Sequence, residues 1–231
     1  MRLDRYITEF NRDRYGNGIT FVDIDMTLFY TFAKIMVMKD GKKVRELDNQ
    51  EYNSYELKDG EDYDFHQFRD ADFFRKTSIP IPQTVKRIKK MLAQIKSQDS
   101  GSKIVFLTAR ETFTSSPKEF AKTFADQGIN IDGKTVMVEF AGNEWKKGEG
   151  IDDTKKRIII RYISSGDYRR VRLIDDHKPN LKALKDIENQ LPVSIEKKVI
   201  DKHNLDMTKE KLPPISFYAL WIDGAGNLNK Y

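Results

Sequence analysis

The chain has 231 residues, of which 39% are hydrophobic and 33% charged, as expected for one soluble globular domain of α/β size. It contains no cysteine, which excludes disulfides, thiolate metal ligands and a cysteine nucleophile. No apolar run is long enough to cross a bilayer, and the first five residues are too charged for a signal segment. We therefore expect a cytoplasmic protein that does not bind membranes.

The net charge is +5 and the pI is about 9.1. This balance is compatible with an anionic substrate or with nucleic acid, but it is too mild to require either. Basic residues cluster at 86–90, 155–157 and 169–172. We interpret these clusters as solvated faces of the protein.

Two elements are expected before residue 29. Apolar residues recur with helical period in residues 2–13, which predicts an amphipathic helix that packs on the core. A β-branched, apolar run then starts at Ile19 and predicts a buried strand of a parallel sheet. Asp23, Asp25 and Thr27 follow that run. Because side chains alternate along a strand, Asp23 and Asp25 should project to the same side.

Residues 29–77 depart from this pattern. Residues 31–38 and 43–47 predict a hairpin around an Asp-Gly turn, and residues 49–74 form an acidic segment rich in Tyr and Phe. We interpret 29–77 as an inserted hairpin and small cap over the end of the first strand, within a single domain that spans 1–231. The alternative is an irregular flank packed on the core.

The rest of the chain alternates between strands and helices. Strands are expected at 103–107, 135–140, 171–174 and 193–200, and helices at 83–96, 117–127, 179–189 and from Asp153 or Thr154 to Gly166. Residues 215–222 and 227–231 are expected to form an edge hairpin. This alternation predicts an α/β fold with a doubly wound, mainly parallel sheet.

Polar residues stand at the carboxyl ends of three predicted strands, where open α/β sheets bind their ligands. They are Asp23, Asp25 and Thr27 after the first strand, Thr108 and Arg110 after the second, and Asp175 and Asp176 after the fourth. Carboxylates from two strands suit Mg²⁺, which prefers oxygen ligands. A carboxylate beside that cation could attack phosphorus, and another could transfer protons.

These residues resemble the four motifs of the haloacid dehalogenase (HAD) superfamily. The first motif is matched by 21–28, the second by 103–108, the third by Lys156 or the adjacent Lys155, and the fourth by 173–176. The layout is similar to the phosphatase domain of polynucleotide kinase-phosphatases and to HAD-like proteins of bacteriophages. The spacing to the acidic pair favours Lys156 over Lys155. The resemblance implies a Rossmann-like sheet with strand order 3-2-1-4-5.

The resemblance also implies roles for these residues. Asp23 would be the nucleophile, and Asp25 the general acid and base. The metal ligands would be Asp23, Asp25 through its backbone carbonyl, Asp175 and Asp176, with Mg²⁺ as the cofactor. The phosphoryl group would be held by Thr27, Thr108 and Lys156, while Arg110 would meet a second substrate anion. An acid at Asp25 favours a phosphatase over a dehalogenase.

Other interpretations stay open. A response-regulator receiver uses similar residues in a different order, with its acidic pair first. A catalytically idle HAD-fold module that binds nucleic acid is the main alternative. The substrate could be a nucleotide or a nucleic-acid 3′-phosphate end, and a sugar phosphate or phosphoprotein is not excluded. His66 in the expected cap and His177 beside the acidic pair could each reach a site.

Overall fold

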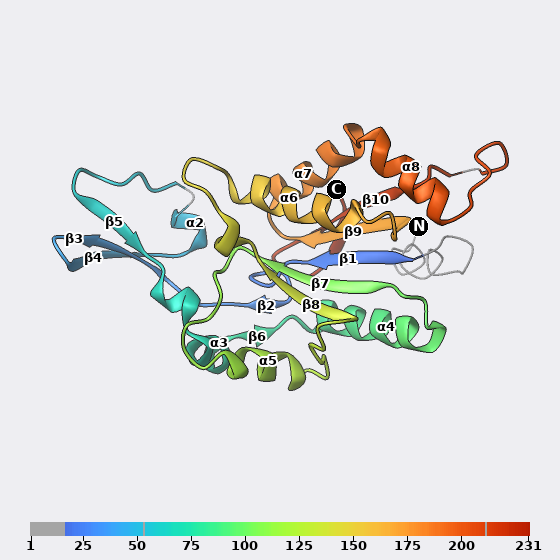
Figure 1. The fold of residues 1–231 in the computed structure, drawn as a ribbon. Helices are drawn as coiled ribbons and strands as arrows, with labels where there is room; N and C mark the ends of the chain where they lie inside the picture. The colour runs from blue at the N-terminus through green and yellow to red at the C-terminus, as the bar shows by residue number, and fades with distance from the viewer. Residues whose placement is uncertain (1–16, 53, 211) are drawn as a thin grey trace.

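A six-stranded sheet forms the centre of the molecule (Figure 1). The computed structural model describes residues 17–231 except 53 and 211, so the helix expected over 2–13 lies outside the described residues. The strands are β1 (Gly18–Val22), β7 (Lys103–Thr108), β8 (Val136–Phe140), β9 (Arg170–Asp175), β10 (Ser216–Ile222) and β11 (Leu228–Lys230). Their order across the sheet is β8-β7-β1-β9-β10-β11. The first five are parallel, and β11 pairs antiparallel with β10. The expected α/β, mainly parallel sheet is therefore confirmed.

Helices cover both faces of this sheet (Figure 1). One face carries α3 (Ala71–Thr77), α4 (Pro82–Gln98) and α5 (Pro117–Ala125), and the other carries α6 (Ile151–Ile163), α7 (Lys178–Asn189) and α8 (Val193–Lys202). Alternation along the strands explains the two layers. In β1, Val22 packs with the first helix layer, whereas Ile19 and Phe21 pack with the second. Both faces are apolar because both are buried.

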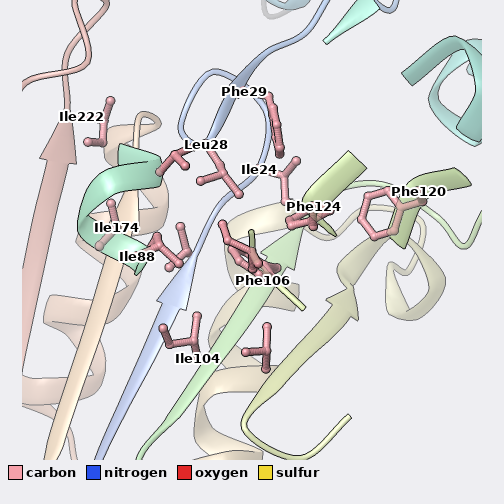
Figure 2. Packing of buried hydrophobic residues seen from close by; sticks show 14 of the residues in the cluster. Ile24, Leu28, Phe29, Ile88, Ile104, Phe106, Phe120, Phe124, Ile174 and Ile222 are labelled. Carbon is pink, nitrogen blue, oxygen red and sulfur yellow. The ribbon is translucent and has the colours of Figure 1, made fainter. Parts of the chain in front are cut away.

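The core under α4 and α5 is rich in aromatic and branched side chains (Figure 2). Phe106 from β7 meets Phe124 of α5 with ring centroids 4.7 Å apart, and Phe124 in turn lies 5.3 Å from Phe29. Ile24 and Leu28, in the loop after β1, are fully buried in the same cluster. This packing holds the loop that carries Asp23, Asp25 and Thr27.

The segment between β2 (Phe29–Tyr30) and β6 (Ile79–Pro80) forms a small sheet of its own. Its strands are β3 (Ile35–Lys39), β4 (Lys42–Leu47) and β5 (Glu61–Asp64), with α2 (Asn49–Tyr52) and the 3-10 helix η2 (His66–Arg69) beside them. The β3–β4 hairpin turns at Asp40 and Gly41, which both have positive φ, as a two-residue type I′ turn requires. We call residues 31–78 the cap.

Three boundaries differ from the sequence prediction. Residues 193–202 form helix α8, not a strand, because Ile195 and Val199 are buried at helical spacing and Lys197 and Lys198 between them are exposed. The fifth parallel strand is β10, which pairs with β9 and also forms the expected edge hairpin with β11. Helix α6 begins at Ile151, with Gly150 as its N-cap, ahead of the expected Asp153 or Thr154.

Among the described residues, no helix combines the length and the apolar character needed to cross a membrane.

Candidate metal and phosphoryl site

The predicted polar strand ends meet because their strands are neighbours. β1 pairs with β7 on one side and with β9 on the other. The backbone N–H of Asp23 donates to the carbonyl of Ile174 (2.9 Å), which continues the ladder beyond β1. Asp23, Thr108 and Asp175 therefore stand at the same edge of the sheet.

A buried lysine joins two of the carboxylates. Lys155 Nζ lies 2.7 Å from Asp23 Oδ1 and 2.9 Å from Asp175 Oδ2, and its side chain is 2% exposed. Burial alone would lower the pKa of Lys155, but Asp175 and Asp23 outweigh burial and raise it. The ammonium group is therefore a fixed positive charge between the ends of β1 and β9.

Sequence spacing favoured Lys156 over Lys155 as the lysine that holds the phosphoryl group, but the structure places Lys155 beside the carboxylates. Lys155 shares its helix face with the buried Ile158 and Ile159, three and four residues on, so it points toward the sheet. Lys156 is rotated by about 100° around the helix and lies half-buried, away from that face. A one-residue difference in spacing cannot be resolved from sequence when both positions are lysine.

Three carboxylates form a compact acidic cluster. Asp23, Asp175 and Asp176 each place a side-chain oxygen within 4.8 Å of the others. Asp23 and Asp175 are buried, and Asp176 is half-buried. Three carboxylates in a buried space repel one another unless cations relieve them. Lys155 supplies one positive charge, and the cluster could hold a metal ion as a second.

Burial governs the acidity of this cluster. It raises the pKa of Asp23 well above the ordinary value, opposed by Lys155 and reinforced by Asp175. Burial, followed by repulsion from Asp175, raises the pKa of Asp176 to about 6. Burial and mutual repulsion therefore oppose the ionised forms of Asp23 and Asp176, which a bound cation would favour. The donor set consists of carboxylate oxygens alone, which fits a hard divalent cation.

Hydrogen bonds fix the acidic pair after β9. Asn180 Nδ2 donates to both oxygens of Asp175, at 3.0 and 2.9 Å. Thr27 Oγ1 donates to Asp176 Oδ1 and accepts from the Asp176 N–H, both at 3.0 Å. Thr27 was expected to hold a phosphoryl group. Its hydroxyl is instead fully buried and occupied with Asp176, so it positions the acidic pair.

Asp25 is held by Arg110. Arg110 Nε donates to Asp25 Oδ2 (3.0 Å) and Nη2 donates to Oδ1 (2.6 Å), and Thr31 Oγ1 also donates to Oδ1 (2.6 Å). Burial would raise the pKa of Asp25, but Arg110 outweighs it and the pKa lies below the ordinary value. Its side chain is not part of the acidic cluster. Asp25 is therefore an ionised carboxylate in this arrangement.

Arg110 was expected to meet a substrate anion, but its side chain is only 1% exposed. Its Nη1 donates to the carbonyl of Phe68 in the cap (3.0 Å), and the guanidinium lies 4.8 Å and 4.9 Å from the rings of Phe68 and Phe74. Its donors are thus used by Asp25 and the cap. Arg110 therefore orients Asp25 and ties it to the cap.

Thr108 ends β7 beside Asp25. Its side chain is buried, its Oγ1 lies 3.5 Å from Asp25 Oδ2, and the same oxygen accepts from the Arg110 N–H (3.2 Å). The 3-10 helix η3 (Ala141–Glu144) supports this loop, since the Gly142 N–H donates to the Arg110 carbonyl (3.1 Å). A Cβ on Gly142 would come 2.7 Å from the Ala109 carbonyl oxygen, so only glycine allows this approach.

The side chains of His66 and His177 lie outside the carboxylate cluster. His66 Nδ1 is 2.8 Å from Asp64 Oδ2 on the cap surface, and His177 is an exposed residue that precedes α7. Sequence reasoning missed Asn180 and Thr31, which bind the site carboxylates. Asn180 lies one helical turn beyond the acidic pair, which is the only signal that could have found it. Thr31 had none.

Searches against protein-family models, curated proteins and solved structures found no match to this chain.

Proposed function

We propose that the protein is a Mg²⁺-dependent phosphomonoester hydrolase of HAD type, which works through an aspartyl phosphate at Asp23. The observation that carries the proposal is the meeting of Asp23, Asp175 and Asp176 around the buried ammonium of Lys155. The strand order β8-β7-β1-β9-β10 supports it as well, because the order is 3-2-1-4-5 when the parallel strands are numbered along the chain.

In the first step, an oxygen of Asp23 attacks phosphorus and the bond from phosphorus to the leaving oxygen breaks. Lys155 lies against Asp23 and can neutralise charge on the phosphoryl oxygens, and Thr108 can donate to them. A Mg²⁺ ion held by Asp23, Asp175 and Asp176 would stabilise the negative charge that develops there.

In the second step, water attacks the phosphorus of the aspartyl phosphate, the bond to Asp23 breaks, and phosphate leaves. An ionised Asp25 suits this step, since a base must take a proton from the water. To protonate the leaving oxygen in the first step, Asp25 must first gain a proton and loosen its contacts with Arg110. As substrates we propose nucleotides or nucleic-acid 3′-phosphate ends, consistent with the basic chain.

The test is phosphate release from p-nitrophenyl phosphate in Mg²⁺. Asp23→Asn keeps the shape of the side chain but removes the nucleophile, so release should fall to background. Asp201→Asn, which changes an exposed carboxylate on α8, is the matched control and should keep wild-type activity. Wild-type rates in Asp23→Asn would falsify the nucleophile assignment. EDTA should abolish activity, and added Mg²⁺ should restore it.

A further inference from the structure

Helix α4 has an unusual distribution of charge. Its 17 residues include five basic side chains and no acidic one. Every other described α-helix contains at least one Asp or Glu. The five positive charges of α4 equal the net charge of the whole chain, +5, so the remaining charges cancel in sum. Helix α4 thus carries the largest net positive charge of the described helices.

Four lysines of α4 form one exposed track, which we call the lysine track: Lys86, Lys89, Lys90 and Lys96. At 100° per residue they fall within an arc of about 120°. The opposite side of the helix carries the buried Ile88 and Met91. Figure 1 shows α4 in the layer below the sheet, with its outer side free of other labelled elements. The track therefore faces solvent.

Within residues 17–231, leaving out 53 and 211, no acidic side chain pairs with the lysine track. Among the described residues, none of the ion pairs involves a side chain of α4, although most other described helices take part in such pairs. Along the chain the nearest acidic residue is Asp99, the C-cap of α4. Lys86 and Lys90 are four residues apart on one face, where like charges destabilise a helix slightly. An external anion would relieve this repulsion.

We infer that the lysine track binds the phosphate backbone of a nucleic acid. From Lys86 to Lys96 the helix rises about 15 Å, a length over which duplex DNA carries on the order of nine phosphate charges. Four ammonium groups along such a line can contact phosphates without base recognition. The inference does not depend on the proposed hydrolysis, because α4 contributes no residue to the acidic cluster.

Other partners fit this face less well. An amphipathic helix binds a membrane by inserting its apolar side, but the apolar side of α4 is buried against the sheet. The centre of a protein interface is usually built from apolar and aromatic anchors and is depleted in lysine. Among the exposed large hydrophobic residues, none belongs to α4; only Ala93 and Ser97 lie between the lysines. A polyanion is the partner that needs no such anchor.

The track also leads toward the site. The N–H of Ile81, the N-cap of α4, donates to the Leu28 carbonyl (2.9 Å) in the loop that carries Asp25 and Thr27. A nucleic acid lying along α4 would therefore run toward the carboxyl edge of the sheet, where the acidic cluster is.

The experiment is fluorescence anisotropy of the full chain with a labelled DNA duplex at several salt concentrations. Four phosphate contacts predict a slope of about −3.6 for log K against log salt, hence roughly 150-fold weaker binding at 200 mM than at 50 mM salt. Lys86→Gln with Lys90→Gln should reduce the slope by about 1.8 and weaken binding roughly 60-fold at 0.1 M salt. Lys89→Gln with Lys96→Gln should do the same.

The control is Lys182→Gln with Lys197→Gln, which removes the same charge from exposed positions on α7 and α8, in the layer on the other face of the sheet. It should leave the affinity within about threefold of wild type. Gln has nearly the helix propensity of Lys, so thermal melting should show both sets of variants folded. The inference is wrong if wild type fails to bind the duplex at 50 mM salt, or if the control loses as much affinity. It is also wrong if phosphatidylserine vesicles are bound as tightly through the same lysines.

Discussion

The residue that most changes the picture of the site is Lys155. It is buried between Asp23 and Asp175 and touches both carboxylates. An isolated ammonium in such a place would be costly to bury, and so would the two carboxylates without it. The three groups are therefore mutually dependent. The adjacent Lys156 is also a lysine, but it is half-buried and does not contact these carboxylates.

We predict that Lys155→Gln lowers the free energy of unfolding by about 3 kcal/mol in EDTA, because two buried carboxylates lose their cation. Lys156→Gln should change it by less than about 0.5 kcal/mol. Urea unfolding of both variants measures the difference. Mg²⁺ should reduce the loss of unfolding free energy in Lys155→Gln, because it restores positive charge to the cluster. Equal stability of the two variants would contradict the placement of Lys155.

At the scale of elements, one side chain contacts both η2 and a site carboxylate. Arg110 extends from the end of β7, donates to the Phe68 carbonyl in η2, and stacks on the rings of Phe68 and Phe74. On its other side it clamps Asp25. A shift of η2 would therefore move the Arg110 guanidinium, and with it the Asp25 carboxylate that Arg110 holds. The other cap aromatics, among them Tyr52, Tyr63 and Phe65, pack on one another.

Phe68→Ala should lower kcat for p-nitrophenyl phosphate by about tenfold, which corresponds to about 1.4 kcal/mol, since Arg110 loses a stacking partner and holds Asp25 less firmly. The control is Phe65→Ala. It removes a ring from the same cluster without touching Arg110, so kcat should change by less than about threefold. Steady-state kinetics on both variants separate the two cases. A loss of equal size in both would mean that the cap acts only through its general packing.

At the scale of the whole molecule, the acidic cluster links three parts of the chain that are far apart in sequence. Asp23 follows β1, Asp175 ends β9 with Asp176 next in the chain, and Lys155, which contacts the cluster, comes from the intervening α6. A metal ion would bind at this site only in the folded state, because these residues are far apart in the unfolded chain. Its binding energy would add to the stability of the fold.

Mg²⁺ should therefore raise the melting temperature. At a concentration of about 100 times its Kd, the stabilisation is about 2.7 kcal/mol, or a shift of roughly 5–10 °C for a chain of this size. Asp175→Asn should remove most of the shift, whatever its effect on the metal-free melting temperature. Thermal scanning with and without Mg²⁺ tests this. No shift in the wild type at millimolar Mg²⁺ would argue against a metal site.

Local patterns in the sequence determined much of the fold. The spacing of apolar residues correctly predicted the strands β1, β7, β8 and β9 and the helices α4, α5 and α7. A strand or helix that is buried on one or two faces needs apolar side chains at a characteristic spacing along the chain. The Asp-Gly turn located the β3–β4 hairpin for the same local reason. The pattern failed at 193–202, where a short apolar run suits either a strand or a buried helix face.

The acidic cluster could also be anticipated, since neighbouring parallel strands bring their carboxyl ends together. What only the tertiary structure decided was the partner of each group. Lys155, and not Lys156, contacts Asp23, Thr27 contacts Asp176, and Arg110 contacts Asp25. Sequence spacing fixes on which element a side chain stands. The partner it meets depends on helix rotation and on packing between segments distant in the chain, which no local pattern records.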